Sequence, residues 1–264
     1  MESLRAAAER LGLAGIGEPM REARILAREA PDAKTFDAFV ARRAKREPVA
    51  YILGRKEFWS LEFEVTPAVL IPRPDSETLM ETALKELKAS PPARILDLGT
   101  GSGCLLIALL TEFSNASGVG IDISREALAV AERNALRHGV NTRADFVETN
   151  FKSPPEECFD LIVANPPYVT DEAFATLDPD VRDHEPRLAL TSGPDGLDAI
   201  QTIARSLHNV MNAGSLTLIE IGHDQGESAA LTLRNEGLIV HRVVKDLGGH
   251  GRVIVATLPQ GART

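Results

Sequence analysis

Four consecutive residues near the middle of the chain, Asn165-Pro166-Pro167-Tyr168, combine groups that can hold a planar amide or amino group. They follow an apolar run at residues 160–164 that is typical of a strand. Proline lacks the backbone N–H that a sheet needs, so the strand ends at Asn165 and a rigid corner follows. The corner offers the Asn165 amide oxygen and proline carbonyls as acceptors, with the Tyr168 ring beside them. The alternative is a strand that simply ends in a Pro-Pro turn.

A second candidate site is the glycine-rich loop Gly99-Thr100-Gly101-Ser102-Gly103, between an apolar strand at 94–98 and a helix at 104–111. Glycines let backbone N–H groups approach a ligand closely, and a helix N-terminus favours negative charge. A dinucleotide fingerprint would need glycine at position 104, where Cys104 stands. The preceding acid, Asp97, suits a ligand with a cationic amino group better than a pyrophosphate. A tight turn that binds no ligand is the alternative.

Residues at the ends of the next strands complete a candidate nucleoside site. Asp122, with Ile123 beside it, stands ~20 residues beyond the loop, where an acid accepts hydrogen bonds from both ribose hydroxyls. Asn150-Phe151 ends the third strand, where a side chain can close over adenine. Asp122 could instead cap a helix or end a solvated strand, and Phe151 could belong to the core. A ligand with adenine, ribose and an amino-acid tail but no phosphate is S-adenosylmethionine.

The apolar pattern predicts a small helical part followed by an α/β part. Apolar residues recur at three- and four-residue spacing in 3–11, 20–28 and 36–46, which predicts helices. Residues 58–65 alternate apolar with acidic, which predicts one half-exposed arm of a linking hairpin, and Ile71-Pro72-Arg73-Pro74 predicts a stiff connector. Beyond it, further strands are expected at 118–123, 145–148, 161–164 and 217–221, and further helices at 125–138, 197–211 and 227–235.

The last two predicted strands, 238–244 and 252–258, are joined by a link so short that they can pair only antiparallel. The predicted fold is therefore α/β, a Rossmann-like sheet that is mostly parallel with an antiparallel edge strand. A small N-terminal helical domain is expected to join it through a β-hairpin linker.

Composition excludes several classes of function. The 264 residues carry a formal net charge of −9, which argues against a surface that holds nucleic acid. No apolar run approaches the roughly 20 residues of a membrane span, and the first residues lack a secretory signal. Two cysteines are too few for a disulfide framework, and six histidines show no paired ligand spacing. We expect a cytoplasmic protein without metal, membrane or direct nucleic-acid binding.

The glycine loop together with Asp122 resembles the class I S-adenosylmethionine-dependent methyltransferases. The Asn165 corner narrows the resemblance to enzymes that methylate a planar nitrogen. Nearly the whole chain is similar to the HemK-type release factor glutamine methyltransferases. Asn150, Phe151, Ser60 and His184 depart from that family's usual residues. The segments that carry the resemblance are Pro48-Val49-Ala50-Tyr51-Ile52-Leu53-Gly54, Leu70-Ile71-Pro72-Arg73-Pro74-Asp75-Ser76-Glu77, Glu185-Pro186-Arg187-Leu188-Ala189-Leu190 and Gly193-Pro194-Asp195-Gly196-Leu197.

The resemblance implies methylation of the glutamine N5 atom in the Gly-Gly-Gln motif of bacterial class 1 peptide chain release factors. S-adenosylmethionine would be the donor and S-adenosylhomocysteine the product. It also implies three domains, a helical substrate-recognition domain (1–55), a linker (56–75) and a methyltransferase domain (76–264). The implied catalytic residues are Asn165, Pro166 and Tyr168, and Pro167 and Arg73 join them in binding substrate. The implied cofactor contacts are Asp97, Gly99, Thr100, Gly101, Ser102, Gly103, Asp122, Ile123, Asn150, Phe151 and Asn165.

Several alternatives stay open. A ribosomal-protein glutamine methyltransferase would share the corner, and so would an adenine-N6 DNA methyltransferase, although base flipping needs basic grooves. A noncatalytic module that only binds S-adenosylmethionine is a third possibility. Cys104 is expected to pack rather than react. Arg73 and Glu77 either hold the seam between the domains or flank the substrate.

Overall fold

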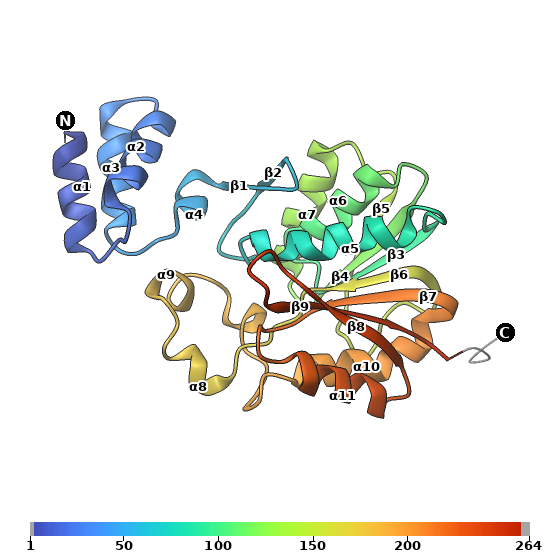
Figure 1. Cartoon of the computed structure of the whole chain (residues 1–264). Coiled ribbons are helices and arrows are strands. Elements are labelled where there is room, and N and C mark those ends of the chain that lie inside the picture. The colour runs from blue at the N-terminus through green and yellow to red at the C-terminus, as the bar shows by residue number, and fades with distance from the viewer. Residues whose placement is uncertain (1–2, 260–264) are drawn as a thin grey trace.

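Seven strands form one open sheet in the computed structural model, which describes residues 3–259 (Figure 1). Neighbouring strands from β5 to β7 pair in parallel, whereas β9 pairs antiparallel with both β7 and β8. The predicted fold class is confirmed, including its antiparallel edge. In sheet order the strands are β5 (Ala144–Glu148), β4 (Ser117–Asp122), β3 (Arg94–Leu98), β6 (Phe159–Ala164), β7 (Met211–Glu220), β9 (Gly251–Thr257) and β8 (Ile239–Lys245).

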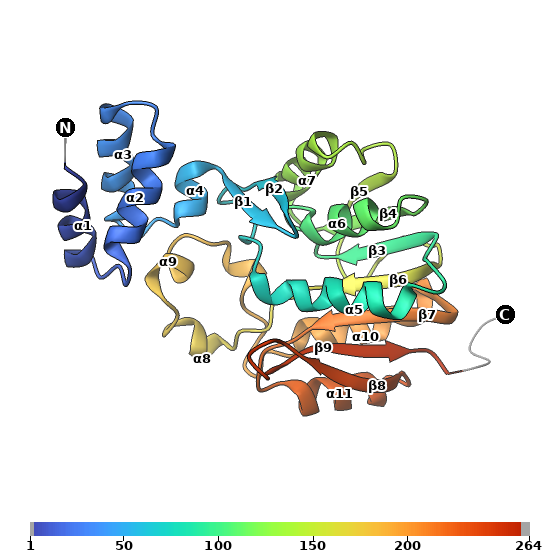
Figure 2. The ribbon, with the colours of Figure 1, turned by 45° about the horizontal axis from the view of Figure 1, so that its top comes forward.

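Helices cover both faces of this sheet, which is why its central strands are apolar almost throughout (Figure 2). On one face Leu106 of α6 packs with Val163 and Leu218, and on the other Ile203 of α10 packs with Ala164. One face carries α5 (Glu77–Leu87), α6 (Cys104–Glu112) and α7 (Arg125–Arg137), and the other carries α10 (Asp198–Val210) and α11 (Gly226–Asn235).

The N-terminal helices form a separate small core from Leu11, Leu26 and Val40. The helix predicted at 36–46 begins earlier, because the Asp32 side chain accepts a hydrogen bond from Thr35 N over 2.7 Å and caps the first turn. The helices of this part are α1 (Leu4–Leu13), α2 (Pro19–Glu29), α3 (Ala33–Arg43) and α4 (Val49–Leu53).

The linking hairpin differs from the sequence prediction. Residues 58–65 do not form a single arm, because Trp59 and Ser60 turn the chain between β1 (Arg55–Phe58) and β2 (Leu61–Glu64). Both turn residues have positive φ, 52° and 59°, which matches a two-residue hairpin turn. The turn lies inside the alternating pattern, so alternation alone could not locate it.

Strand β7 also starts earlier than the predicted 217–221. The helix predicted at 197–211 ends at Val210, and Met211 already pairs with Phe159 of β6. The register between β6 and β7 shifts here, because residues 212–215 of β7 lie opposite a single residue of β6, Asp160. This irregularity interrupts the alternating pattern and hides the first half of the strand.

A long connection between β6 and α10 lies between the sheet and the N-terminal helices (Figures 1 and 2). Arg46, just after α3, pairs with Asp178 and Asp180 of this connection, each over 2.5 Å. Its short helices are α8 (Asp171–Phe174), α9 (Pro179–Arg182) and the 3-10 turn Arg187–Ala189.

Within residues 3–259, no helix is long and apolar enough to cross a membrane. The domain limits 1–55, 56–75 and 76–264 remain a proposal. Positions 1, 2 and 260–264 of those domains lie outside the described residues.

Candidate functional site

The glycine loop and the Asn165 corner lie side by side at the point where the strand order reverses. Strands β3 and β6 are parallel neighbours, and Leu98 at the end of one pairs with Ala164 at the end of the other. From β3 the chain continues outward to β4 and β5, whereas β6 leads to β7 on the opposite side. The loops that follow β3 and β6 therefore diverge and leave a crevice, which is where open α/β sheets bind ligands.

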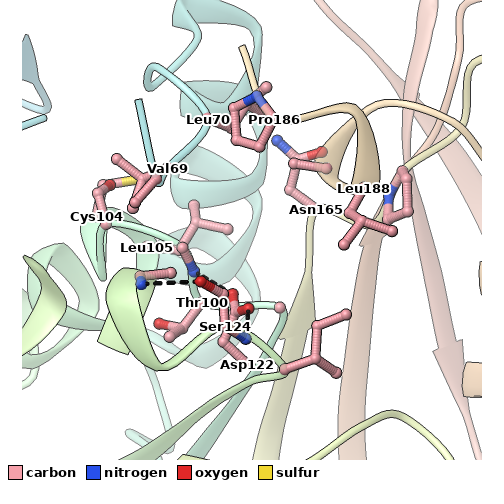
Figure 3. Close-up of a pocket in the computed structure, with 18 of the residues that line it drawn as sticks. Val69, Leu70, Thr100, Cys104, Leu105, Asp122, Ser124, Asn165, Pro186 and Leu188 are labelled. Carbon is pink, nitrogen blue, oxygen red and sulfur yellow. Dashed lines mark hydrogen bonds between the residues drawn. The ribbon is translucent and has the colours of Figure 1, made fainter. Parts of the chain in front are cut away.

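A cavity of 690 Å³ occupies this crevice (Figure 3). Its volume is within the usual range for a small-molecule site. Asp122 lies in the lower part of the view and Asn165 in the upper right, with Leu188 beside Asn165. Among the predicted site residues, Asp97, Gly103, Pro166 and Tyr168 do not line the cavity. Those that line it are Arg73, Gly99, Thr100, Gly101, Ser102, Asp122, Ile123, Asn150, Phe151, Asn165 and Pro167.

The glycines of the loop share one backbone conformation, but Gly101 and Gly103 serve different purposes. All three adopt positive φ, at 77°, 54° and 79° for Gly99, Gly101 and Gly103. A Cβ atom at Gly103 would lie 2.9 Å from Ile107 of α6, so this glycine lets the loop pack. A Cβ atom at Gly101 would meet nothing within 4 Å, so the backbone there is open to the cavity. Gly101 is therefore the position where a ligand can approach the main chain most closely.

Asp122 is held in place by two backbone groups. Its Oδ2 atom accepts a hydrogen bond from Gly101 N over 3.0 Å, and Oδ1 accepts one from Ser124 N over 2.9 Å (Figure 3). Each carboxylate oxygen can accept a second hydrogen bond. Exposed Ile123 and half-buried Phe151 add apolar surface to the same end of the cavity. Asn150 is exposed, and its side chain accepts a hydrogen bond from Lys152 N over 2.9 Å.

Asp97 lies behind the glycine loop and is almost completely buried. Its Oδ2 atom accepts a hydrogen bond from the Thr100 hydroxyl over 2.7 Å, but Oδ1 has no partner among the described residues. Burial raises the pKa of this carboxyl group to about 7. An unpaired buried carboxylate oxygen is costly, so it favours a cationic or donor group beside it.

The Asn165 corner is fixed by contacts that the sequence prediction missed. The Asn165 Nδ2 atom donates a hydrogen bond to the Ser76 hydroxyl over 3.0 Å, whereas no residue from 3 to 259 donates to Oδ1, the acceptor of the amide. The Tyr168 carbonyl accepts a hydrogen bond from Gln225 Nε2 over 3.0 Å. Gly196 packs against this carbonyl so closely that a Cβ atom would lie 2.3 Å from it. Ser76 and Gly196 belong to the segments that carry the family resemblance, and that was the only signal for them.

Asn134 is a further residue that the sequence prediction missed. It is fully buried on α7, and its Nδ2 atom donates to the carbonyls of Ser102 and Glu64, over 2.9 and 3.0 Å. Its Oδ1 atom accepts a hydrogen bond from Glu64 N over 2.7 Å. The side chain thus ties the linker hairpin to the cofactor loop. A polar residue on the apolar face of a predicted helix was the available signal.

Arg73 and Glu77 contact different parts of the protein. Arg73 lines the cavity and pairs with buried Glu185 over 2.5 Å, and Glu185 also accepts a hydrogen bond from Ile71 N. Glu77 instead accepts a hydrogen bond from Trp59 N over 3.2 Å and does not line the cavity. Arg73 therefore joins the connector to the loop beyond the corner, and Glu77 anchors the hairpin.

The fold is that of the class I methyltransferases, and comparisons with known proteins agree. The Methyltransferase small domain family matches residues 75–178, and the PrmC N-terminal domain family matches residues 28–54. Ribosomal protein L11 methylase from Lactobacillus delbrueckii subsp. bulgaricus shares the fold, with a TM-score of 0.55 and 19% identity, covering 74% of this chain and 84% of that one.

Two relatives match nearly end to end. The release factor glutamine methyltransferase of Caulobacter vibrioides is 40% identical over 95% of this chain and 93% of its own. That of Cereibacter sphaeroides is 42% identical over 98% of both chains. This chain belongs to the release factor glutamine methyltransferases. The family predicted from the sequence motifs is confirmed.

Proposed function

We propose that this protein transfers a methyl group from S-adenosylmethionine to glutamine N5 in the Gly-Gly-Gln motif of bacterial class 1 release factors. The proposed site of action is the cytoplasm, where these factors work. One observation carries the proposal: the Asn165 amide, with Oδ1 as its free acceptor, borders the same cavity as the glycine loop. Membership in a family whose relatives are named for this reaction supports the choice of substrate.

The residues present suit S-adenosylmethionine. The unpaired Oδ1 atom of Asp97 is an acceptor for the ammonium group of its amino-acid tail. The open backbone at Gly101 suits close approach, and both Asp122 oxygens can accept from ribose hydroxyls. Ile123 and Phe151 offer apolar surface to adenine, with Asn150 at its edge. When bound, this cofactor would supply a methyl group on a positively charged sulfur, from which the methyl carbon can pass to a nitrogen atom while the sulfur leaves as a neutral thioether.

The corner would act on the substrate amide through acceptors. An amide nitrogen is a poor nucleophile because its lone pair is delocalised into the carbonyl. Asn165 Oδ1 and the Pro166 carbonyl would each accept a hydrogen bond from one N–H group of the substrate amide. They would thereby stabilise the positive charge that grows on the amide nitrogen during attack. Pro167 keeps this corner rigid, and Tyr168 would position the amide plane.

No strong general base is required, because the amide proton can leave after the methyl group arrives. Cys104, which lines the cavity, is not a nucleophile in this scheme. Burial raises the pKa of its thiol to about 12, so the thiol stays protonated at neutral pH. The side chain serves to pack the first turn of α6.

Recognition of the release factor is assigned to the helical part, residues 1–55, and to the cavity rim. Arg73 is half-buried at this rim, with its guanidinium paired to Glu185, and exposed Leu188 lines the same cavity. These residues would border the backbone of the substrate loop. The ion pairs from Arg46 to Asp178 and Asp180 support a fixed placement of the helical part beside that rim.

One labelling experiment tests the function. The protein is incubated with methyl-labelled S-adenosylmethionine and, in separate reactions, a bacterial release factor, its Gly-Gly-Gln variant with Gln→Ala, ribosomal protein, or duplex DNA. We expect label only on the unaltered release factor, on the glutamine peptide identified by mass spectrometry. Label that survives the Gln→Ala change, or that appears only on ribosomal protein or DNA, would overturn the proposal.

A further inference from the structure

Glu220, the last residue of β7, is a fully buried carboxyl group that the scheme above does not use. Its side chain has no exposed surface, and neither Oε atom has a hydrogen-bond partner of acceptable geometry among the described residues. The pKa of this carboxyl group is raised to about 7, because the effect of burial exceeds the lowering effects of the Ser76 hydroxyl and Arg252. A carboxyl group in such a place lowers stability, which calls for a compensating role.

The sheet places Glu220 next to the corner. Ala164 of β6 pairs with Ile219 of β7. The residues that follow them, Asn165 and Glu220, therefore lie side by side at the ends of two neighbouring strands. Side chains at one level of a sheet point to one face, and here that face carries the turn that opens α5. Ser76 ends this turn and is 2% exposed. The Ser76 hydroxyl accepts the hydrogen bond of Asn165, and it is also near enough to Glu220 to lower the pKa of that carboxyl group.

The other charged groups around Glu220 have partners of their own. Arg252 of β9 pairs with Asp75 over 3.1 Å and with Asp246 over 3.2 Å. Arg73 pairs with Glu185, and burial together with the nearby charge of Glu220 raises the pKa of Tyr168 to about 12. Since these cations are already paired, Ser76 is the neighbour whose hydrogen is available. Its oxygen accepts from Asn165, so its own hydrogen can turn to the carboxylate.

We propose that Glu220 is a positioning residue for methyl transfer, which accepts the hydrogen of Ser76 and thereby holds Asn165 Oδ1 toward the substrate amide. This inference rests on the proposed function of Asn165. In this arrangement Asn165 donates to Ser76 and Ser76 donates to Glu220. Because both hydrogen bonds run in the same direction, each polarises the other. The ionised carboxylate also adds negative charge behind the acceptor, where positive charge develops on the substrate nitrogen.

Variants of the two residues test this chain. Glu220→Met keeps the length of the side chain but removes the acceptor, and Ser76→Ala removes the link. We expect each to lower kcat about tenfold to hundredfold, as for groups that orient an acting residue, with little change in the dissociation constant of S-adenosylhomocysteine. Because both act through one path, the double variant should be no slower than the slower single variant.

A conservative variant and a control separate positioning from folding. Glu220→Gln keeps an acceptor oxygen without charge, so it should recover part of kcat. At saturating cofactor the wild-type kcat should rise with pH through about 7, and this rise should be absent in Glu220→Gln. Asp246→Asn also alters a partner of Arg252, but Asp246 makes no contact with the Asn165 corner, so this variant should keep the wild-type kcat. Thermal melts verify that each variant is folded.

The outcomes distinguish this inference from the proposed function. If the wild-type protein does not methylate the release factor, the proposed function fails first. If the wild-type protein is active but folded Glu220→Met keeps its kcat, Glu220 is not a positioning residue. Fully additive losses in the double variant would likewise overturn the chain through Ser76.

Discussion

The side-chain nitrogen of Asn165 donates a hydrogen bond to the Ser76 hydroxyl over 3.0 Å, although 89 positions separate the two residues in the chain. The contact joins the end of β6 to the turn before α5. It uses the only donor group of the amide and so fixes which way the amide faces. An amide that could rotate would present N–H groups to the substrate half of the time, and two donors would repel each other.

Removing the Asn165 amide should abolish methyl transfer and leave cofactor binding largely intact. For Asn165→Ala we expect kcat to fall at least about a hundredfold, because an acceptor at a site of developing charge is lost. Activity is measured by methyl labelling of the release factor, and binding of S-adenosylhomocysteine by calorimetry. Loss of binding in parallel with activity would mean that Asn165 mainly shapes the cofactor site.

Cofactor affinity should depend on pH through Asp97. In the free protein, burial raises the pKa of its carboxyl group to about 7, and an ammonium partner would lower it again. Below pH 7 the Asp97 carboxyl group must lose its proton before it can pair with the ammonium group. Affinity for S-adenosylhomocysteine should therefore fall up to about tenfold for each pH unit by which the pH is lowered. Calorimetry in two buffers of different ionisation enthalpy should detect proton release on binding.

The variant Asp97→Asn is the control for this pH dependence. It has no proton to lose, so its weaker affinity should stay constant between pH 5.5 and 7.5. A wild-type affinity that is flat over the same range would contradict pairing of Asp97 with the ammonium group.

Glu220 should reduce the stability of the free protein above neutral pH. Its folded pKa, about 7, exceeds the ordinary value of 4.5, so between these values only the folded state keeps the proton. Stability therefore falls as pH rises from 4.5 to 7. Glu220→Gln should match wild type near pH 4.5 and exceed it by up to about 3 kcal/mol at pH 8. Urea unfolding at several pH values measures this, and a difference that does not grow with pH would refute the prediction.

Asn134 should couple the linker hairpin to the cofactor loop. Asn134→Ala leaves buried backbone groups of Glu64 and Ser102 without partners, and we expect a loss of about 2–4 kcal/mol with severalfold weaker cofactor binding. The neighbouring Arg133→Ala removes only a half-exposed ion pair to Glu64, so it should cost under about 1 kcal/mol. Equal effects in denaturant unfolding would show that Asn134 has no special coupling role.

Gly196 should be required for the shape of the corner. It has a φ of 74°, and a Cβ atom would lie 2.3 Å from the Tyr168 carbonyl, so Gly196→Ala should displace the corner and lower kcat at least about tenfold. Gly139→Ala is a matched control, because its φ of 68° carries the same backbone strain with nothing within 4 Å. The methylation assay should separate the two variants, and similar kcat values would rule out the steric explanation.

The sequence by itself determined the order of most elements and both motifs that border the cavity. Apolar periodicity is a local property, so strands such as β3 and helices such as α6 were placed within one or two residues. The glycine loop and the Asn165 corner were found because glycine and proline have backbone constraints that no neighbour can change. Helix α5 was missed, and the hairpin turn at Trp59 was misplaced, because neither had such a marker.

Only the tertiary structure decided which residues work together. The pairing of Leu98 with Ala164 brings the loop and the corner to one crevice, and no local pattern encodes that pairing. The same holds for the contact of Asn165 with Ser76 and for the place of Glu220 behind them. These contacts depend on the order of strands across the sheet, which is set by the packing of both helical layers and not by the spacing of residues along the chain.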